Sequence, residues 1–167
     1  MMSVAARHAT WPVLAALLLA PALVSSPLAA QELKLRTLSP LASWNLSPRL
    51  GIAEDSLRSV GRGVWIHDVQ AGNGARADSG MVLEVHYVGL LADGRIFDAT
   101  ESRPFAFTLG TGRVIYVWED GLLGMRVGGR RQLVIPPHLG YGIEGAGAVP
   151  PDAVLVFDVT LVGLRSR

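Results

Sequence analysis

The feature that most constrains the fold is a series of short strand patterns, joined by tight turns, between Val64 and Leu164. The clearest is the segment 81–91, in which successive side chains alternate between two faces. The Asp93-Gly94 pair that follows favours a tight hairpin. The segment 153–164 is apolar on both faces, which is typical of a central, buried strand. Only one segment between these strands, 118–125, favours a helix, of two turns.

The connections are short, and strand and helix patterns do not alternate regularly. Such a chain forms a mainly antiparallel sheet, because parallel strands need long crossover connections. The sequence therefore predicts an α+β fold with a five- to six-stranded antiparallel sheet and one short helix.

The first thirty residues have the order of a secretory signal peptide: a basic start with Arg7, an apolar run at 11–24, and small residues at 25–30. We therefore predict a signal peptide over 1–30, with an uncleaved membrane anchor as the alternative. The apolar run is shorter than the roughly 20 residues that span a bilayer. Residues 61–167 are predicted to form the domain. Residues 31–60 are interpreted as an N-terminal extension with one short helical turn, packed onto the domain, and disorder of this stretch is the alternative.

The charge balance of the predicted mature chain argues against polyanionic partners. Removing Arg7 from the 15 basic residues leaves 14, against 14 acidic ones. A neutral domain gives no electrostatic basis for binding nucleic acid, or a membrane after signal cleavage. The chain has no cysteine, which excludes disulfides, thiol nucleophiles and thiolate metal sites. His67, His86 and His138 do not share metal-ligand spacing, so we predict no metal and no cofactor.

Aromatic residues make up only 7% of the chain, yet most of them fall on the predicted strands and loops around Trp118. A ligand site with aromatic walls and a few placed polar groups is the usual form of a small-molecule pocket. Any one of these rings could instead be an ordinary core residue. Together they predict an aromatic-lined pocket near the segment 114–121.

Seven motifs in this order resemble the FKBP-type peptidyl-prolyl isomerases, over about residues 61–164. They are Val85-His86-Tyr87-Val88-Gly89, Gly94-Arg95-Ile96-Phe97-Asp98, Pro104-Phe105-Ala106-Phe107, Val114-Ile115 with Trp118-Glu119, Tyr141-Gly142, Val149-Pro150-Pro151 and Leu155-Val156-Phe157-Asp158-Val159. The resemblance implies a sheet wrapped around the short helix, with a pocket between the two.

The resemblance also implies a role for each matching residue. Trp118 is expected to form the floor under a substrate proline ring. The Ile115 backbone N–H and the Tyr141 hydroxyl are expected to hold substrate carbonyls, and Asp98 to be an acceptor at the pocket edge, held by Tyr87 or Arg103. The expected catalytic residues are Phe97, Asp98, Trp118 and Tyr141, and the expected substrate-binding residues are Tyr87, Phe105, Phe107, Val114, Ile115, Val149 and Phe157.

The chemistry of an X–Pro bond suits such a pocket. Rotation breaks amide resonance and has a barrier of roughly 18–20 kcal/mol. A dry aromatic pocket disfavours the charge-separated planar form relative to the twisted one. This reaction needs no nucleophile, metal or cofactor.

Together with the predicted signal peptide, the resemblance implies an exported isomerase that is expected to act as a monomer. Its expected compartment is the periplasm if the source is a two-membrane bacterium, and otherwise the outside of the membrane. Its expected ligands are unfolded or partly folded proline-containing polypeptides, with macrolide inhibitors as a further class. The alternatives are a weakly active binding module or holdase chaperone, and a partner domain that dimerises through residues 31–59.

Two positions depart from the family pattern. Val117 stands where glycine usually precedes the tryptophan, and a β-branched residue resists positive φ and close backbone approach. We therefore expect lower activity, which Val117→Gly would raise. The loop 143–149 is a residue shorter than in many relatives, with Ala148 near a usual aliphatic position, which affects the pocket rim and substrate preference.

Overall fold

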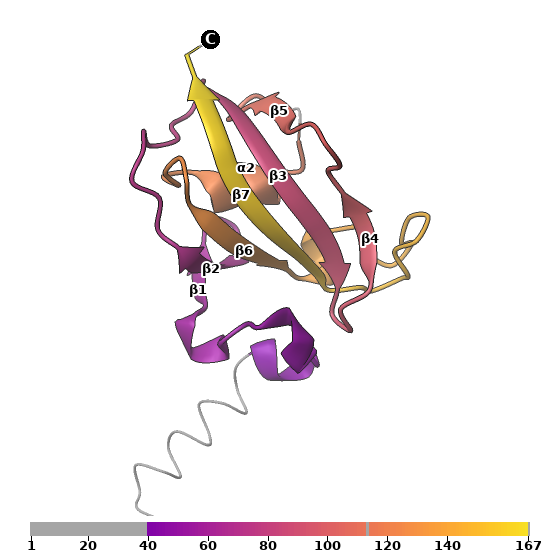
Figure 1. The fold of residues 1–167 in the computed structure, drawn as a ribbon. Coiled ribbons are helices and arrows are strands. Elements are labelled where there is room, and N and C mark those ends of the chain that lie inside the picture. Colours follow the sequence, from indigo (N-terminus) through magenta and orange to yellow (C-terminus); the bar gives the residue numbers. More distant parts are fainter. Residues whose placement is uncertain (1–39, 113, 167) are drawn as a thin grey trace, which may run out of the picture. The chain divides into compact units, whose positions relative to one another are not determined.

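The computed structural model describes residues 40–112 and 114–166, so the predicted signal peptide and residues 31–39 lie outside the described part. A seven-stranded antiparallel sheet dominates the described residues, with one α-helix against it (Figure 1). The strands are β1 (Arg58–Val60), β2 (Val64–Gln70), β3 (Val82–Leu91), β4 (Ile96–Ala99), β5 (Phe105–Thr108), β6 (Arg130–Ile135) and β7 (Leu155–Arg165). The predicted α+β class is confirmed, and β1 is the strand that the sequence patterns did not indicate.

The sheet has the order β1-β2-β6-β7-β3-β4, and β5 pairs with the other end of β3. The two longest strands, β3 and β7, lie side by side at its centre (Figure 1). The predicted hairpin joins β3 to β4: Gly94 N–H donates to the Leu91 carbonyl at 2.9 Å, and Gly94 has a φ of 90°. Glycine suits this position because other residues rarely adopt positive φ.

The α-helix, α2 (Tyr116–Leu122), crosses one face of the sheet, which we call the helix face. Our prediction of a helix over 118–125 was wrong in its bounds by two to three residues. The helix ends early because Leu123 has extended backbone angles and Gly124 has a φ of 76°. Gly121 lies directly over Leu133, and its missing side chain lets the helix approach the sheet closely.

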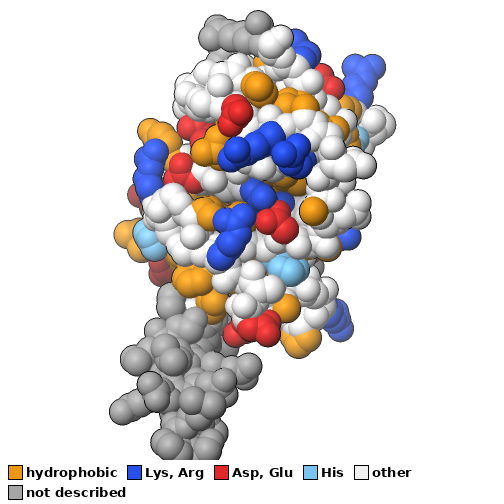
Figure 2. Space-filling view, turned by 90° about the vertical axis from the view of Figure 1, so that its left-hand side faces the viewer, with side chains coloured by type: hydrophobic (Ala, Val, Ile, Leu, Met, Phe, Trp, Pro, Cys, Tyr) orange, Lys and Arg blue, Asp and Glu red, His pale blue; other side chains and the backbone are white. Residues whose placement is uncertain are grey.

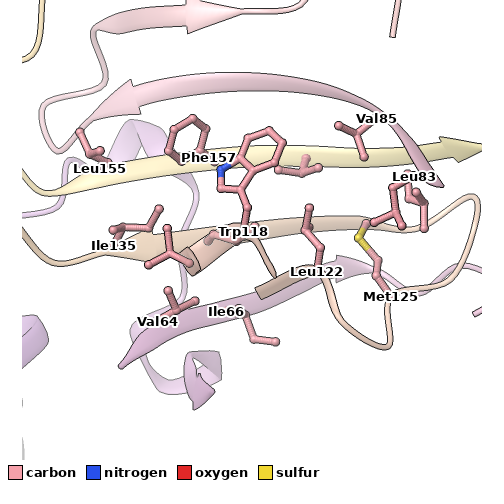
Figure 3. Close-up of a cluster of buried hydrophobic side chains, with 14 of the residues drawn as sticks. Val64, Ile66, Leu83, Val85, Trp118, Leu122, Met125, Ile135, Leu155 and Phe157 are labelled. Atoms are coloured by element: carbon pink, nitrogen blue, oxygen red, sulfur yellow. The ribbon is translucent and has the colours of Figure 1, made fainter. Parts of the chain in front are cut away.

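The main core fills the space between α2 and the helix face. Figure 3 shows Trp118 and Leu122 of α2 pointing into it, beside Phe157, Val85 and Leu83 of the sheet. Leu83, Leu122 and Leu133 have no exposed surface. Burial of each large apolar side chain of this kind contributes about 1.5–3 kcal/mol, so this core fixes where α2 sits.

A second apolar cluster covers the opposite side of the sheet, which we call the outer face. The segment that precedes β1 contributes to it and contains the turns η1 (Pro40–Ser43), η2 (Pro48–Leu50) and η3 (Glu54–Ser56), of which η3 has no buried residue. Leu41, Leu50 and Leu57 are buried there against Val134 and Val156. The strands β6 and β7 are therefore covered on both faces. In the part of the chain that the structure describes, no helix is long and apolar enough to cross a membrane.

Candidate functional site: an aromatic cluster on the helix face

Six aromatic rings meet on the helix face, and Trp118 lies at their centre. Its ring centroid lies 4.9 Å from Tyr87, 5.3 Å from Phe157, 5.8 Å from Phe107 and 6.2 Å from Phe105, all edge-on. Phe97 joins the cluster through Phe157, at 5.5 Å. These edge-to-face pairs contribute about 0.5–1.5 kcal/mol each beyond burial, so the rings hold one another in place. The structure thus brings together all six predicted aromatic residues of β3, β4, β5, α2 and β7.

The cluster is closed at its base and open on one side. Trp118, Phe107 and Phe157 are only 4–5% exposed, whereas Phe105 is 41% exposed. Tyr87 and Phe97 are half-buried between these extremes. The accessible side of the cluster therefore offers ring faces and edges that are already packed from behind.

Asp98 lies at the edge of this cluster and is held by Tyr87. The Tyr87 hydroxyl donates a hydrogen bond to Asp98 Oδ2 at 2.7 Å. Of the two partners predicted for Asp98, Tyr87 and Arg103, the structure therefore shows Tyr87. Thr100 holds the backbone of Tyr87, because the Tyr87 N–H donates to Thr100 Oγ1 at 3.0 Å. The bond between Tyr87 and Asp98 joins β3 to β4 and gives the aromatic wall one charged acceptor.

The environment of Tyr87 keeps its hydroxyl protonated. Burial raises the pKa of Tyr87, and the hydrogen bond and negative charge of Asp98 raise it further, followed by Tyr141, to about 12. The phenol is therefore a stable donor at physiological pH.

This pKa shift predicts how stability changes at high pH. Because the pKa of Tyr87 is raised on folding, its contribution is complete below the ordinary value of 10.0 and is lost as pH rises toward about 12. Absorbance titration should show the ionisation of Tyr87 near pH 12 in the parent, and this step should be lost in Tyr87→Phe. In Asp98→Asn the same step should move to lower pH. An unchanged step in Asp98→Asn would show that Asp98 does not raise the pKa of Tyr87.

Three contacts fix Trp118 by fixing its helix. The Trp118 N–H donates to the Ile115 carbonyl at 2.9 Å, which closes the first turn of α2. Glu119 Oε1 accepts a hydrogen bond from the Gly112 N–H at 2.7 Å and ties the preceding loop to the helix. At the other end, Arg131 Nη1 donates to the Gly121 carbonyl at 2.8 Å. The helix is short, so these end contacts replace bonds that a longer helix would supply itself.

Four other predicted residues, Val114, Ile115, Tyr141 and Val149, make no ring contact with the aromatic cluster. Val149 is buried in the same core, and Val114 packs against that core. Ile115 and Tyr141 are 40% and 43% exposed. Among the described residues, the Ile115 N–H has no hydrogen-bond partner.

Sequence reasoning missed the contribution of Gly89. A Cβ at this position of β3 would lie 2.8 Å from Phe97 Cζ and 3.1 Å from Phe157 Cε1, so glycine is what allows these rings to meet. The sequence shows the glycine of the Tyr87-Val88-Gly89 motif. It does not show that two rings approach Gly89 closely, because these rings come from two other strands.

The structure changes the interpretation of Val117. Its φ is not positive, so a β-branched residue is not strained here in the way that the sequence suggested. Val117 is 3% exposed and belongs to the main core. The valine therefore contributes apolar packing next to Trp118.

One cavity among the described residues lies on the outer face. It is a groove of about 450 Å³ lined by outward residues of β3, β6 and β7, such as His86, Gln132 and Thr160. Arg130 and Asp158 form a bidentate ion pair in it, at 2.7 and 2.8 Å. Tyr87 also lines this groove, but the other five residues of the aromatic cluster do not. No group of three His, Cys, Asp or Glu in the described residues could hold a metal ion.

Known proteins are similar to this chain in both sequence and fold. Residues 74–162 match the family described as FKBP-type peptidyl-prolyl cis-trans isomerase. FK506-binding protein 2 of Yarrowia lipolytica is 52% identical over 92 residues, which cover 53% of this chain and 64% of that protein. FK506-binding protein 4 of Aspergillus fumigatus is 43% identical over 105 residues, which cover 62% of this chain and 22% of that protein. The chain thus spans less than two thirds of the length of these relatives.

A crystal structure of a peptidyl-prolyl cis-trans isomerase from Pseudomonas syringae pv. tomato superposes with a TM-score of 0.62 at 32% identity, and the match covers 84% of this chain and 98% of that one. The likeness thus extends from the motifs to the arrangement of the strands around the helix. The chain belongs to the FKBP-type peptidyl-prolyl cis-trans isomerase family.

Proposed function

We propose that this chain is a peptidyl-prolyl cis-trans isomerase that binds the proline of its substrate against the open side of the aromatic cluster. The observation that carries the proposal is the Trp118 indole, packed edge-on by four other rings at the base of a cluster whose outer ring, Phe105, is exposed. An apolar, proline-sized group can cover these rings without displacing a bound polar partner. Family membership supports the same reaction.

The proposed mechanism uses desolvation and one backbone donor. The planar X–Pro imide carries more charge separation than the twisted state, so burial against aromatic rings lowers the barrier between the isomers. The Ile115 N–H, which is unpaired within the described residues, can hold a substrate carbonyl at the edge of the cluster while the bond rotates. The Tyr141 hydroxyl is proposed as a second donor, and Asp98 as an acceptor that keeps Tyr87 in place.

The test is an isomerisation assay on a series of X–Pro tetrapeptides with the purified protein. We expect faster cis–trans conversion than in buffer, with a dependence on the residue before proline. The competing function, a holdase chaperone with the same apolar surface, predicts suppression of client aggregation without any acceleration. Absence of turnover together with such suppression would decide for the holdase.

Gly89→Ala is expected to lower the isomerase rate. Its Cβ would displace Phe97, and a shift of about 1 Å in a substrate-binding group can cost roughly a hundredfold in rate. Gly163→Ala is the matched control, because it also lies in a central strand but meets the flexible Glu84 side chain. Measurement of kcat/KM for both variants checks this, and equal rates for the two would contradict the role assigned to Gly89.

Val117→Gly is now expected to destabilise the protein and not to raise its activity. Loss of a buried valine and insertion of glycine in a helix together cost about 2–4 kcal/mol. Chemical denaturation should show this loss, and Val117→Ala should show the smaller part that comes from packing alone. An increase in kcat/KM for Val117→Gly would contradict this expectation. It would support the prediction made from the sequence, in which glycine is needed next to Trp118.

The remaining proposals concern ligands and location. We propose unfolded or partly folded proline-containing polypeptides as substrates. FK506-type macrolides are proposed as competing ligands, because relatives are named for that ligand. We further propose export, to the periplasm in a two-membrane bacterium, and a monomeric state. Cell fractionation, N-terminal sequencing of the mature chain and sedimentation test these points separately.

A further inference from the structure

Four arginines and one carboxylate gather on the side of the molecule where the C-terminal end of α2 meets the ends of β2 and β6. They are Arg58, Arg76, Arg126, Arg131 and Asp68. Figure 2 shows basic side chains across the middle of one face of the protein, with acidic ones beside them. The set is unusual because the chain as a whole is almost neutral.

Arg76 and Arg126 are forced together by the backbone. They are directly opposite each other in an antiparallel bridge. The Ala77 N–H donates to the Met125 carbonyl at 2.8 Å, and the Val127 N–H donates to the Ala75 carbonyl at 3.0 Å. This pattern makes the two arginines a non-hydrogen-bonded pair, the kind in which opposite side chains come closest. Like charges in this position destabilise a sheet.

No carboxylate within the described residues lies at ion-pair distance from Arg76 or Arg126. The nearby Asp68 is already shared, since it pairs with Arg131 at 2.6 Å and with Arg58 at 3.3 Å. Arg126 Nη1 donates to the Gly74 carbonyl, which fixes the guanidinium without neutralising it. The cluster therefore holds an excess of positive charge on a rigid backbone.

A small cavity adjoins these groups. It has a volume of about 160 Å³ and is lined by Arg126, Arg131 and Asp68 together with glycines 72, 124 and 129. Arg76 reaches its rim, because its Nη2 lies 3.1 Å from where a Cβ on Gly124 would be. This volume is below the roughly 300–1,000 Å³ of sites for drug-sized ligands, so it suits a small ion or one charged group.

We propose that Arg76 and Arg126 form a binding site for an oxyanion, a phosphate or carboxylate group, at this cavity. Guanidinium groups bind such groups through paired hydrogen bonds, and an anion between the two arginines would remove their mutual repulsion. The site lies at the far end of α2 from the Ile115 edge of the aromatic cluster, so it is not part of the proposed isomerase site.

The test is a titration of the whole protein with inorganic phosphate at pH 7, with chloride added to keep ionic strength constant. Arginine Nε–Hε signals in NMR should show saturable shifts for Arg76 and Arg126, with a dissociation constant on the order of 1–10 mM. N-acetylglutamate in a parallel titration distinguishes a carboxylate from a phosphate, because the preferred anion saturates at lower concentration.

In the double variant Arg76→Gln, Arg126→Gln, the backbone amide signals of Gly72 and Gly124, which line the cavity, report binding in place of the lost arginine signals. Half-saturation of their shifts should need at least tenfold more phosphate than in the parent, while the isomerase rate stays that of the parent. Arg95→Gln is the control, since Arg95 is 70% exposed and already paired with Asp93. Shifts that grow linearly, that chloride reproduces, or that survive in the double variant would overturn the proposal.

Discussion

Replacing Trp118 with alanine should cost both rate and stability, and these are the largest effects expected of any pocket substitution. Loss of a buried tryptophan costs about 3–5 kcal/mol of unfolding free energy. The substrate proline would lose the surface it rests on, so kcat/KM should fall by roughly ten- to a hundredfold. Denaturant unfolding and the tetrapeptide assay measure the two effects on the same preparation.

Trp118→Phe separates the pocket role from the folding role. The Trp118 Nε1–H is buried and has no hydrogen-bond partner in the described residues, so phenylalanine removes no bond there. The stability loss should therefore be smaller, about 1–2 kcal/mol for the lost ring volume. If the folded Trp118→Phe and Trp118→Ala proteins both keep the parent's kcat/KM, Trp118 is a core residue and not the base of a substrate site.

Asp68→Asn is the second change with a large expected effect, although it lies outside the aromatic cluster. It removes the charge that compensates Arg131, whose side chain is only 7% exposed. Breaking a fully buried pair costs roughly 3–5 kcal/mol. We expect about 2–3 kcal/mol here, because the Asp68 side chain is 39% exposed and water can replace part of its charge. Chemical denaturation at pH 7 measures the loss.

Asp93→Asn is the matched control for that experiment. Asp93 and Arg95 form a similarly short ion pair, at 2.7 Å, but the arginine is 70% exposed. Exposed pairs of this kind contribute little to stability. Equal losses in the two variants would show that burial of Arg131 is not what makes the first pair matter.

The stability of the parent and that of Asp68→Asn should also depend differently on pH in acid. Partial burial acts to raise the pKa of Asp68, but the hydrogen bonds and charges of Arg131 and then Arg58 outweigh it and lower the pKa below 3.8. The stabilisation is present above the ordinary pKa and is lost as pH falls through the lower, folded-state value. The parent should therefore lose more stability than Asp68→Asn over this acidic range.

Much of the sheet could be predicted because its signals are local. The alternation of β3 and the Asp93-Gly94 turn determine a hairpin within one stretch of sequence. The order of the family motifs then predicted that the six aromatic rings belong to one pocket. The strand and helix patterns by themselves did not predict which rings contact one another. The bounds of α2 were harder, since they depend on Leu123 and Gly124 leaving helical geometry.

The contacts that were missed join residues far apart in sequence. Arg131 pairs with Asp68 across 63 positions and donates to Gly121 at the end of α2. Nothing in the local sequence marks that arginine as buried, because arginine is usually exposed. The environment of Val117 was also inaccessible from sequence, since backbone angles and core contacts decide whether valine is tolerated there.

The segment with the turns η1 to η3 on the outer face limits how far the protein can be shortened at its N-terminal end. A chain shortened to begin at Gly61, where the family resemblance begins, would lose β1 and uncover Val134, Val154 and Val156. Exposed apolar strands of this kind favour self-association. Such a fragment would be poorly soluble even with its aromatic cluster intact. The shortest well-behaved protein should therefore start near Pro40, about twenty residues before the family resemblance begins.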